Sequence, residues 1–206
     1  MNNGVELSKA KQYIRDLTGG SLLIEESRLV AETLLRALPD AEWKRLFIEE
    51  NILKKKSQHT AIRYARSVRR RLEPLGGSFI DAVTHAPESY YKQLLMLSLM
   101  IHTPVLTDFM RHVVAETKRI YRPNLEPDAW CSFLLDRSRI FPGLNDLSES
   151  TLKKSGNNVI RALVEADYLD NNKSRRLQPV YLLPETRVWL HTLNREDLEP
   201  VMECTL

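Results

Sequence analysis

The sequence predicts an all-α protein organised mainly as a helical bundle. Apolar residues recur at intervals of three and four positions through most of the 206 residues, which is the spacing of one helix face. Glycine is scarce, at 7 residues, and this disfavours a β-rich or loop-rich chain. Apolar residues make up 43% and charged residues 28% of the sequence, as in ordinary globular proteins, so we expect a folded chain rather than a disordered one.

The first third of the chain predicts three helices. Residues 18–20 form a turn, and Ser21 is a suitable N-cap because its hydroxyl can accept a hydrogen bond from a free backbone N–H of the next segment. Leucine and valine then recur at helical spacing over 22–38. Asp40 can cap a second helix, and a third, opened by a serine, is expected over 57–72.

The middle of the chain predicts three more helices. A short helix is expected over 79–85. The segment 90–101 is apolar nearly all round, which is typical of a buried central helix. Thr103 and Pro104 give an N-cap followed by proline at the first helical position, and this helix should end before Pro123.

The last third predicts a different arrangement, similar to a winged helix-turn-helix with a short β-hairpin. A helix from residue 126 is followed by a short helix over 147–154 and a longer one over 157–166. A polar, basic turn at 170–176 then leads into an expected short strand over 178–183. This order is that of a winged helix, although a proline inside the expected strand weakens it, because proline cannot donate to a β-ladder.

We therefore predict a helical bundle with a basic helix over 1–125 and a helix-turn-helix-like segment over 126–206 that packs on it. A single continuous domain is the alternative. No internal repeat or low-complexity segment interrupts this scheme.

A concentration of basic residues is the strongest functional feature. No acidic residue lies between Glu50 and Glu73, and this stretch carries eight cations against a net charge of +3 for the whole chain: Lys54, Lys55, Lys56, Arg63, Arg66, Arg69, Arg70 and Arg71. At about 100° per residue, Arg63, Arg66 and Arg70 lie opposite the apolar side of the helix. A polyanion would relieve their mutual repulsion and release counterions. The alternative is a solvated face whose arginines pair with carboxylates of other helices.

A second, weaker candidate surface lies in the expected winged helix. Its members are Lys153, Lys154, Asn157, Asn158, Arg161, Lys173, Arg175 and Arg176. An asparagine can bond an adenine edge in a major groove, and backbone N–H groups at a helix start suit phosphate. The basic turn would then contact the DNA backbone or minor groove. The alternative is an ordinary helical hairpin with a polar turn.

The sequence offers no catalytic or metal-binding constellation. Its five histidines are scattered, and no pair has the spacing of a metal-binding helix motif. Cys131 and Cys204 lie 73 positions apart, and such a pair builds neither a disulfide framework nor a metal motif. We expect both to be reduced thiols, as in a cytosolic protein. The N-terminus lacks a signal-peptide pattern, and the most apolar run, 94–101, is too short to span a bilayer. We expect a cytoplasmic protein that is not an enzyme, with no cofactor, metal, membrane or small-molecule substrate.

Two segments resemble the BrxA family of the bacterial BREX (bacteriophage exclusion) defence systems. They are YIRDLTGGSLLIEESR at residues 13–28, which is the distinctive run, and LVEADYL at 163–169. The resemblance extends over the whole chain in size and helical order. It implies a small all-helical protein that binds double-stranded DNA and acts beside other BREX components, including a methyltransferase, an ATPase and a phosphatase-like protein. It supplies no catalytic residue.

Two classes of function follow from these observations. The first is a DNA-binding subunit that uses the 54–71 cations, with the 157–176 region as a second contact and with phosphate contacts dominating. The second is a protein–protein adaptor that docks the basic helix on an acidic partner. RNA is an alternative ligand, since exposed basic helices bind either kind of duplex.

Overall fold

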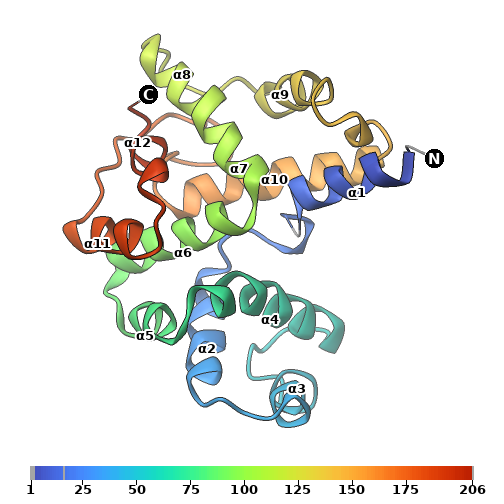
Figure 1. Ribbon diagram of the computed structural model, residues 1–206, viewed down its shortest axis with the longest axis vertical. Helices are drawn as coiled ribbons and strands as arrows, with labels where there is room; N and C mark the ends of the chain where they lie inside the picture. The colour runs from blue at the N-terminus through green and yellow to red at the C-terminus, as the bar shows by residue number, and fades with distance from the viewer. Residues whose placement is uncertain (1–2, 16, 206) are drawn as a thin grey trace. The chain divides into compact units, whose positions relative to one another are not determined.

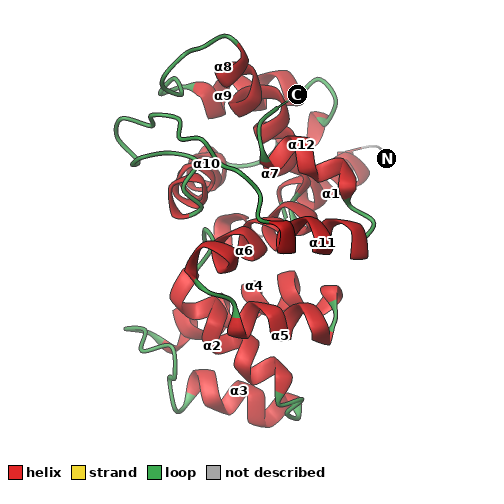
Figure 2. Ribbon diagram, turned by 90° about the vertical axis from the view of Figure 1, so that its left-hand side faces the viewer, coloured by secondary structure: helices red, strands yellow, loops and turns green. Residues whose placement is uncertain are grey.

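The computed structural model describes residues 3–15 and 17–205, and over these residues the chain is built of helices joined by loops (Figure 1). Figure 2 shows helices and loops in the described part and no strand. The predicted all-α class is therefore confirmed.

The described chain divides into two compact units. The central unit runs from Leu22 to His102, and the terminal unit combines the residues up to Ser21 with those from Thr103 onward. The residue at which the sequence analysis divided the chain, 125, falls within the terminal unit, and a separate 126–206 domain stays a prediction.

The central unit is a small helical bundle. Its elements are α2 (Ile24–Leu35), α3 (Asp40–Ile48), α4 (Gln58–Leu72), the 3-10 turn η2 (Glu73–Leu75), α5 (Gly77–His85) and α6 (Glu88–His102). In α6 every residue from Leu94 to Met100 is buried, as the apolar pattern predicted. α2 packs against α4 and α5.

Arg28 ties the elements of the central unit together. Its guanidinium donates to the backbone oxygens of Thr84 at 2.5 Å and Ala86 at 2.9 Å, and thereby holds the end of α5 against α2. Its Cζ lies 4.1 Å from the ring centroid of Tyr91, whose hydroxyl donates to the Ile24 oxygen at 2.6 Å. The end of the distinctive 13–28 run thus has a structural role.

The start of α2 differs from the prediction. The helix begins at Ile24, and the residue before it, Leu23, has a left-handed φ of 57° and makes no side-chain cap. Ser21 is therefore not the N-cap. Within the terminal unit its hydroxyl donates to Glu165 Oε1 at 2.9 Å instead, so a partner distant in sequence replaces the expected local bond.

The terminal unit contains the remaining elements. They are α1 (Asn3–Ile14), η1 (Leu17–Gly19), α7 (Pro104–Phe109), the π-helical turn η3 (Met110–Val114), α8 (Ala115–Arg119), α9 (Ala129–Arg137), η4 (Pro142–Leu144), α10 (Glu149–Glu165), α11 (Pro184–Thr192), η5 (Glu196–Leu198) and α12 (Glu199–Met202). An aromatic cluster lies in its core, where the Phe109 ring meets Trp130 and Phe133 edge-on at 5.4 and 5.3 Å.

The predicted helix-turn-helix is wrong, because its two helices are one. The expected helices over 147–154 and 157–166 form the single helix α10, capped by Ser148, whose Oγ accepts from the Thr151 N–H. Gly156 lies in the middle of α10 against the Trp130 ring. This glycine permits a close contact between α9 and α10.

The predicted β-hairpin is also not formed as strands. The described residues carry two isolated antiparallel bridges, Asn124 with Arg176 and Leu169 with Leu177, and 178–183 has no ladder. Backbone donors here find other partners: the Leu182 N–H donates to Glu203 Oε1 at 3.1 Å. Prolines at 179 and 184 supply no N–H, so a ladder cannot extend.

Candidate nucleic-acid interface

The basic stretch of the central unit begins with a rigid lead-in to α4. Ser57 is the N-cap, as predicted, and its Oγ accepts from the Thr60 N–H at 3.2 Å. The side-chain amide of Asn51 closes the preceding turn. Its Oδ1 accepts from the backbone N–H of Lys55 at 3.1 Å, and its Nδ2 donates to the backbone oxygen of Lys55 at 2.8 Å. The lead-in therefore holds Lys54 and Lys56 in exposed positions.

Lys55 points differently from its two neighbours. Its Nζ lies 2.5 Å from Glu26 Oε1, in a pair whose side chains are 24% and 11% exposed. The carboxylate of Glu26, on α2, thus neutralises the charge of Lys55. Within the described residues Lys54 and Lys56 form no ion pair.

A stripe of basic side chains runs along α4. It consists of His59, Arg63, Arg66 and Arg70, which recur at intervals of four, three and four, and we call it the α4 stripe. The opposite side of the helix is buried through Ala61, Ala65, Val68 and Leu72. Its ends are 11 residues apart, or about 16 Å along the helix axis. The sequence analysis found the three arginines but not His59.

The arginines of the stripe are presented in different ways. Arg66 and Arg70 are exposed, and Arg66 forms no ion pair within the described residues. Arg63 is half-buried: its Cζ lies 5.2 Å from the Tyr64 ring centroid, and its Nε is buried without a hydrogen-bond partner. The aromatic ring restrains Arg63 without neutralising it.

Arg69 and Arg71 do not belong to this surface. The Arg69 guanidinium bonds Asp40 at 2.8 Å and Glu73 at 3.1 Å, and it lies 4.9 Å from the Trp43 ring. Its hydrogen bond lowers the pKa of the Asp40 carboxyl below its ordinary value. Arg71 is only 4% exposed. Both arginines therefore stabilise the central unit rather than present free charge.

The second predicted surface divides into parts with different roles. The side chain of Asn158 donates to the Leu17 oxygen at 2.6 Å and so ties α10 to η1. Arg161 pairs with Glu165 at 2.8 Å. Lys154 is exposed beside Lys153 at the start of α10, and within the described residues neither lysine forms an ion pair.

The basic turn at 170–176 is closed by hydrogen bonds within the loop. The carboxylate of Asp170 accepts from the Ser174 hydroxyl and from the backbone N–H of Arg176, and the Ser174 bond lowers the pKa of Asp170. Arg175, at φ 51°, donates to the Pro127 oxygen at 2.9 Å. Lys173 and Arg176 remain exposed at the surface.

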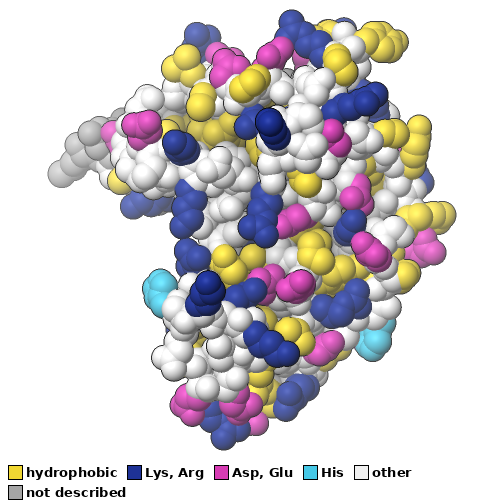
Figure 3. Space-filling view, turned by 180° about the vertical axis from the view of Figure 1, so that it is seen from behind, with side chains coloured by type: hydrophobic (Ala, Val, Ile, Leu, Met, Phe, Trp, Pro, Cys, Tyr) yellow, Lys and Arg dark blue, Asp and Glu magenta, His cyan; other side chains and the backbone are white. Residues whose placement is uncertain are grey.

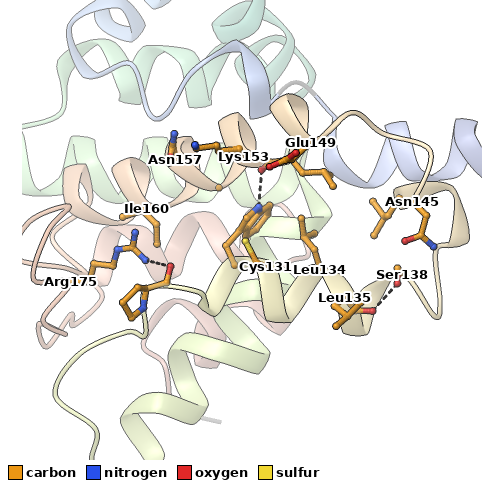
Figure 4. Close-up of a pocket in the computed structure, with 15 residues that line it drawn as sticks. Cys131, Leu134, Leu135, Ser138, Asn145, Glu149, Lys153, Asn157, Ile160 and Arg175 are labelled. Carbon is orange, nitrogen blue, oxygen red and sulfur yellow. Dashed lines mark hydrogen bonds between the residues drawn. The ribbon is translucent and has the colours of Figure 1, made fainter.

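Three of the predicted residues line one groove in the terminal unit. Lys153 and Asn157 lie four residues apart on the same side of α10, and Arg175 lines the groove from the basic turn (Figure 4). The groove lies between α9 and α10 and has a volume of about 600 Å³. Its other walls are mostly apolar, so these residues form the rim of an apolar groove rather than a basic face. We call it the α9–α10 groove.

Charge alone does not single out a surface on this protein. In Figure 3, Lys and Arg side chains stand among Asp and Glu side chains over the face that is shown. The cations that matter are those without a carboxylate partner. In the central unit Lys54, Lys56, Arg63 and Arg66 form no ion pair within the described residues. Arg70 lies next to Arg66 on the same face of α4.

The described residues contain no group of three or more His, Cys, Asp or Glu side chains placed to hold a metal ion. None of the described helices is by itself long and apolar enough to cross a membrane, although the consecutive segments Glu88–His102 and Pro104–Arg119 meet that requirement when joined across a sharp bend.

Comparisons with known proteins identify the family. The family model described as BrxA matches residues 11–194. The chain belongs to the BrxA family. A BREX protein BrxA of Escherichia coli O9:H4 (strain HS) is 39% identical to this BrxA-family chain over 193 residues, covering 94% of the chain and 91% of the relative. A BREX protein BrxA of Paramagnetospirillum magneticum (strain ATCC 700264 / AMB-1) is 30% identical over 185 residues, covering 90% and 93%.

A solved structure has the same fold as this BrxA-family chain. It is the crystal structure of an uncharacterized protein from Magnetospirillum magneticum, with a TM-score of 0.85 and 27% sequence identity. The match covers 94% of this chain and all of the other. The resemblance drawn from residues 13–28 is thus confirmed as family membership.

Proposed function

We propose that this BrxA-family protein is a non-catalytic DNA-binding component of a BREX phage-defence system, and that it binds double-stranded DNA through the α4 stripe and the exposed lysines before it. The proposal rests on the cations of this surface that form no ion pair within the described residues, namely Lys54, Lys56, Arg63 and Arg66. Family membership supports the assignment to BREX defence and to work beside other BREX proteins. Two free thiols are in keeping with the reducing cytoplasm.

The shape of the basic surface favours a duplex. A helix with its side chains is about 10–12 Å wide, close to the width of the major groove of B-DNA at about 12 Å. The stripe extends about 16 Å along α4 and begins at a capped helix N-terminus, where backbone N–H groups suit phosphate. Long basic side chains on one straight helix thus match the phosphates that border a groove.

Phosphate contacts should dominate, with little sequence preference. Four phosphate contacts from the five Lys and Arg side chains of this surface give a slope of about −3.6 in a plot of log affinity against log salt concentration. Affinity should then fall roughly 150-fold between 50 and 200 mM salt. The α4 stripe holds no asparagine or glutamine to read an adenine edge, and we expect its arginines to contact phosphates.

A titration of labelled duplexes of increasing length tests the proposal. We expect salt-sensitive binding that strengthens with duplex length, is competed by unrelated duplex DNA, and leaves the DNA intact in the presence of Mg²⁺. Binding that neither strengthens with duplex length nor is competed by unrelated duplex DNA, or no binding at 50 mM salt, would favour an adaptor that docks on a protein. Tighter binding to duplex RNA than to duplex DNA of equal length would also contradict the proposal.

A further inference from the structure

The α9–α10 groove is not explained by DNA binding. Its floor and walls are formed by Trp130, Leu134, Leu144, Leu152, Gly156 and Ile160. These side chains offer no donor to a phosphate, because the only N–H among them, on the Trp130 indole, is already bonded to the Leu152 oxygen at 3.0 Å. A duplex presents phosphates and sugars to a protein surface, so an apolar floor is the wrong complement for it.

The groove is held in a fixed form. The Trp130 ring packs on Gly156 and is anchored by its bond to the α10 backbone, while Phe109 and Phe133 support it from the core. Binding here would therefore cost little ordering of the protein. One lip carries Leu135, which is 68% exposed although it lines an apolar groove. Together with the apolar floor, Leu135 extends a contiguous apolar surface that reaches solvent, which is typical of a protein-binding groove.

The rows of residues along the groove suit a helical partner. On α10 the floor residues Leu152, Gly156 and Ile160 recur every fourth position and span eight residues, or about 12 Å. On α9 the lining residues 131, 134 and 135 recur at helical spacing, and Ser138, the C-cap of the helix, continues the row. A trough between two helices, about two turns long, matches the way an amphipathic helix lays apolar anchors at i, i+4 and i+7 into a groove.

The charges at the rim select the partner. Lys153 and Arg175 face the groove without a carboxylate partner within the described residues, and Glu149 is the one acidic side chain of the lining. Arg175 is fixed by its bond to the Pro127 oxygen, so its charge stays at the rim. Two cations against one carboxylate favour acidic residues beside the apolar anchors.

We propose that the α9–α10 groove is the docking site for an acidic amphipathic helix of a partner protein. Apolar side chains of that helix pack on Leu134, Leu144 and Ile160, and its carboxylates face Lys153 and Arg175. This inference is independent of DNA binding, since it concerns a different unit from the α4 stripe and its test uses no nucleic acid.

The chain carries its own reporter for occupancy of the groove. Cys131 is exposed and lines the groove, whereas Cys204 is buried and its pKa is raised by burial to about 11. At pH 8 a thiol reagent should therefore modify Cys131 selectively. A ligand seated between α9 and α10 covers that thiol and slows its alkylation.

Two synthetic 15-residue helical peptides test the proposal with the full-length chain. One carries leucine at i, i+4, i+7 and i+11 on a glutamate-rich background, and its twin carries lysine in place of every glutamate. We expect the acidic peptide to bind, measured by fluorescence anisotropy, and to slow Cys131 alkylation at least fivefold at saturation.

Lys153→Glu should weaken this binding at least fivefold, whereas Lys154→Glu, the same change at a neighbour outside the groove, should alter it less than twofold. Leu135→Asp should also weaken it at least fivefold, and because Leu135 is exposed the variant should fold normally, as circular dichroism would check.

Three results would overturn the proposal. Equal protection of Cys131 by both peptides would remove the role of charge, and no protection by either would remove the docking site. Protection by a small apolar anion such as anilinonaphthalene sulfonate, with none by the acidic peptide, would make the groove a small-molecule site.

Discussion

The ring of Trp130 lies directly over Gly156, so closely that a Cβ on residue 156 would clash with the ring carbon Cδ1. Because no side chain fits between them, glycine is required in the middle of α10 despite its poor helix propensity. This contact joins α9 to α10 and forms the floor of the α9–α10 groove.

Gly156→Ala should destabilise the protein by about 1–2 kcal/mol. The gain of about 1 kcal/mol in helix propensity is outweighed by a clash with a fixed indole ring, since overpacking a core costs about 1–3 kcal/mol and this overlap is severe. The free energy of unfolding in urea measures the effect. Gly77→Ala is the matched control, because a Cβ at that position meets nothing within 4 Å. A stabilised Gly156→Ala variant would show that the ring moves aside freely.

The Glu26–Lys55 pair should contribute to stability. Glu26→Gln leaves the half-buried Lys55 ammonium without its counter-ion, so we expect a loss of about 2 kcal/mol in the free energy of unfolding. Glu25→Gln, at an exposed position next in sequence, should change it by less than about 0.5 kcal/mol. Equal effects of the two substitutions would mean that the pair contributes nothing specific.

Cys204 should make stability fall at high pH. Burial raises the pKa of its thiol from 9.0 to about 11, so the folded protein retains a proton that the unfolded chain loses. This contribution is fully present below pH 9 and is lost as the pH rises from 9 to 11, by about 2–3 kcal/mol in total. The free energy of unfolding of wild type and of Cys204→Ala would be measured at each pH. The contributions of the other groups that titrate in this range are common to both proteins and cancel in the difference. A difference in the free energy of unfolding that does not change between pH 8 and 11 would contradict the assignment.

The sequence predicted the helices whose pattern is local. α4 and α6 were found because amphipathic spacing and an unbroken apolar run are properties of adjacent residues. The continuity of α10 was missed because it depends on the contact between Trp130 and Gly156, two residues 26 positions apart. The hairpin was predicted from a basic turn, whereas distant acceptors such as Glu203 take the backbone donors that a ladder would need.

The candidate site was predicted in part for the same reason. The eight cations of residues 54–71 are visible in the sequence, but their partners are not. Arg69 is neutralised by Asp40, 29 positions away, and Lys55 by Glu26 from another helix. The α9–α10 groove was missed altogether, and its one sequence signal was a glycine inside a helical pattern with a tryptophan elsewhere in the unit.

The central claim is that the α4 stripe binds duplex DNA, and the measurement that tests it most directly compares two triple variants of equal charge. Arg63→Gln, Arg66→Gln and Arg70→Gln together remove the three arginines of the stripe and leave His59 in place. The control removes Arg119, Arg122 and Arg139, three exposed arginines that each pair with a carboxylate of the terminal unit. Affinity for a 24-base-pair duplex would be measured from 50 to 200 mM salt. We predict that the stripe variant loses affinity at low salt and that its log–log salt slope becomes shallower by about 2.7, while the control keeps the wild-type slope. Equal loss in both variants, or wild-type binding by the stripe variant, would contradict the claim.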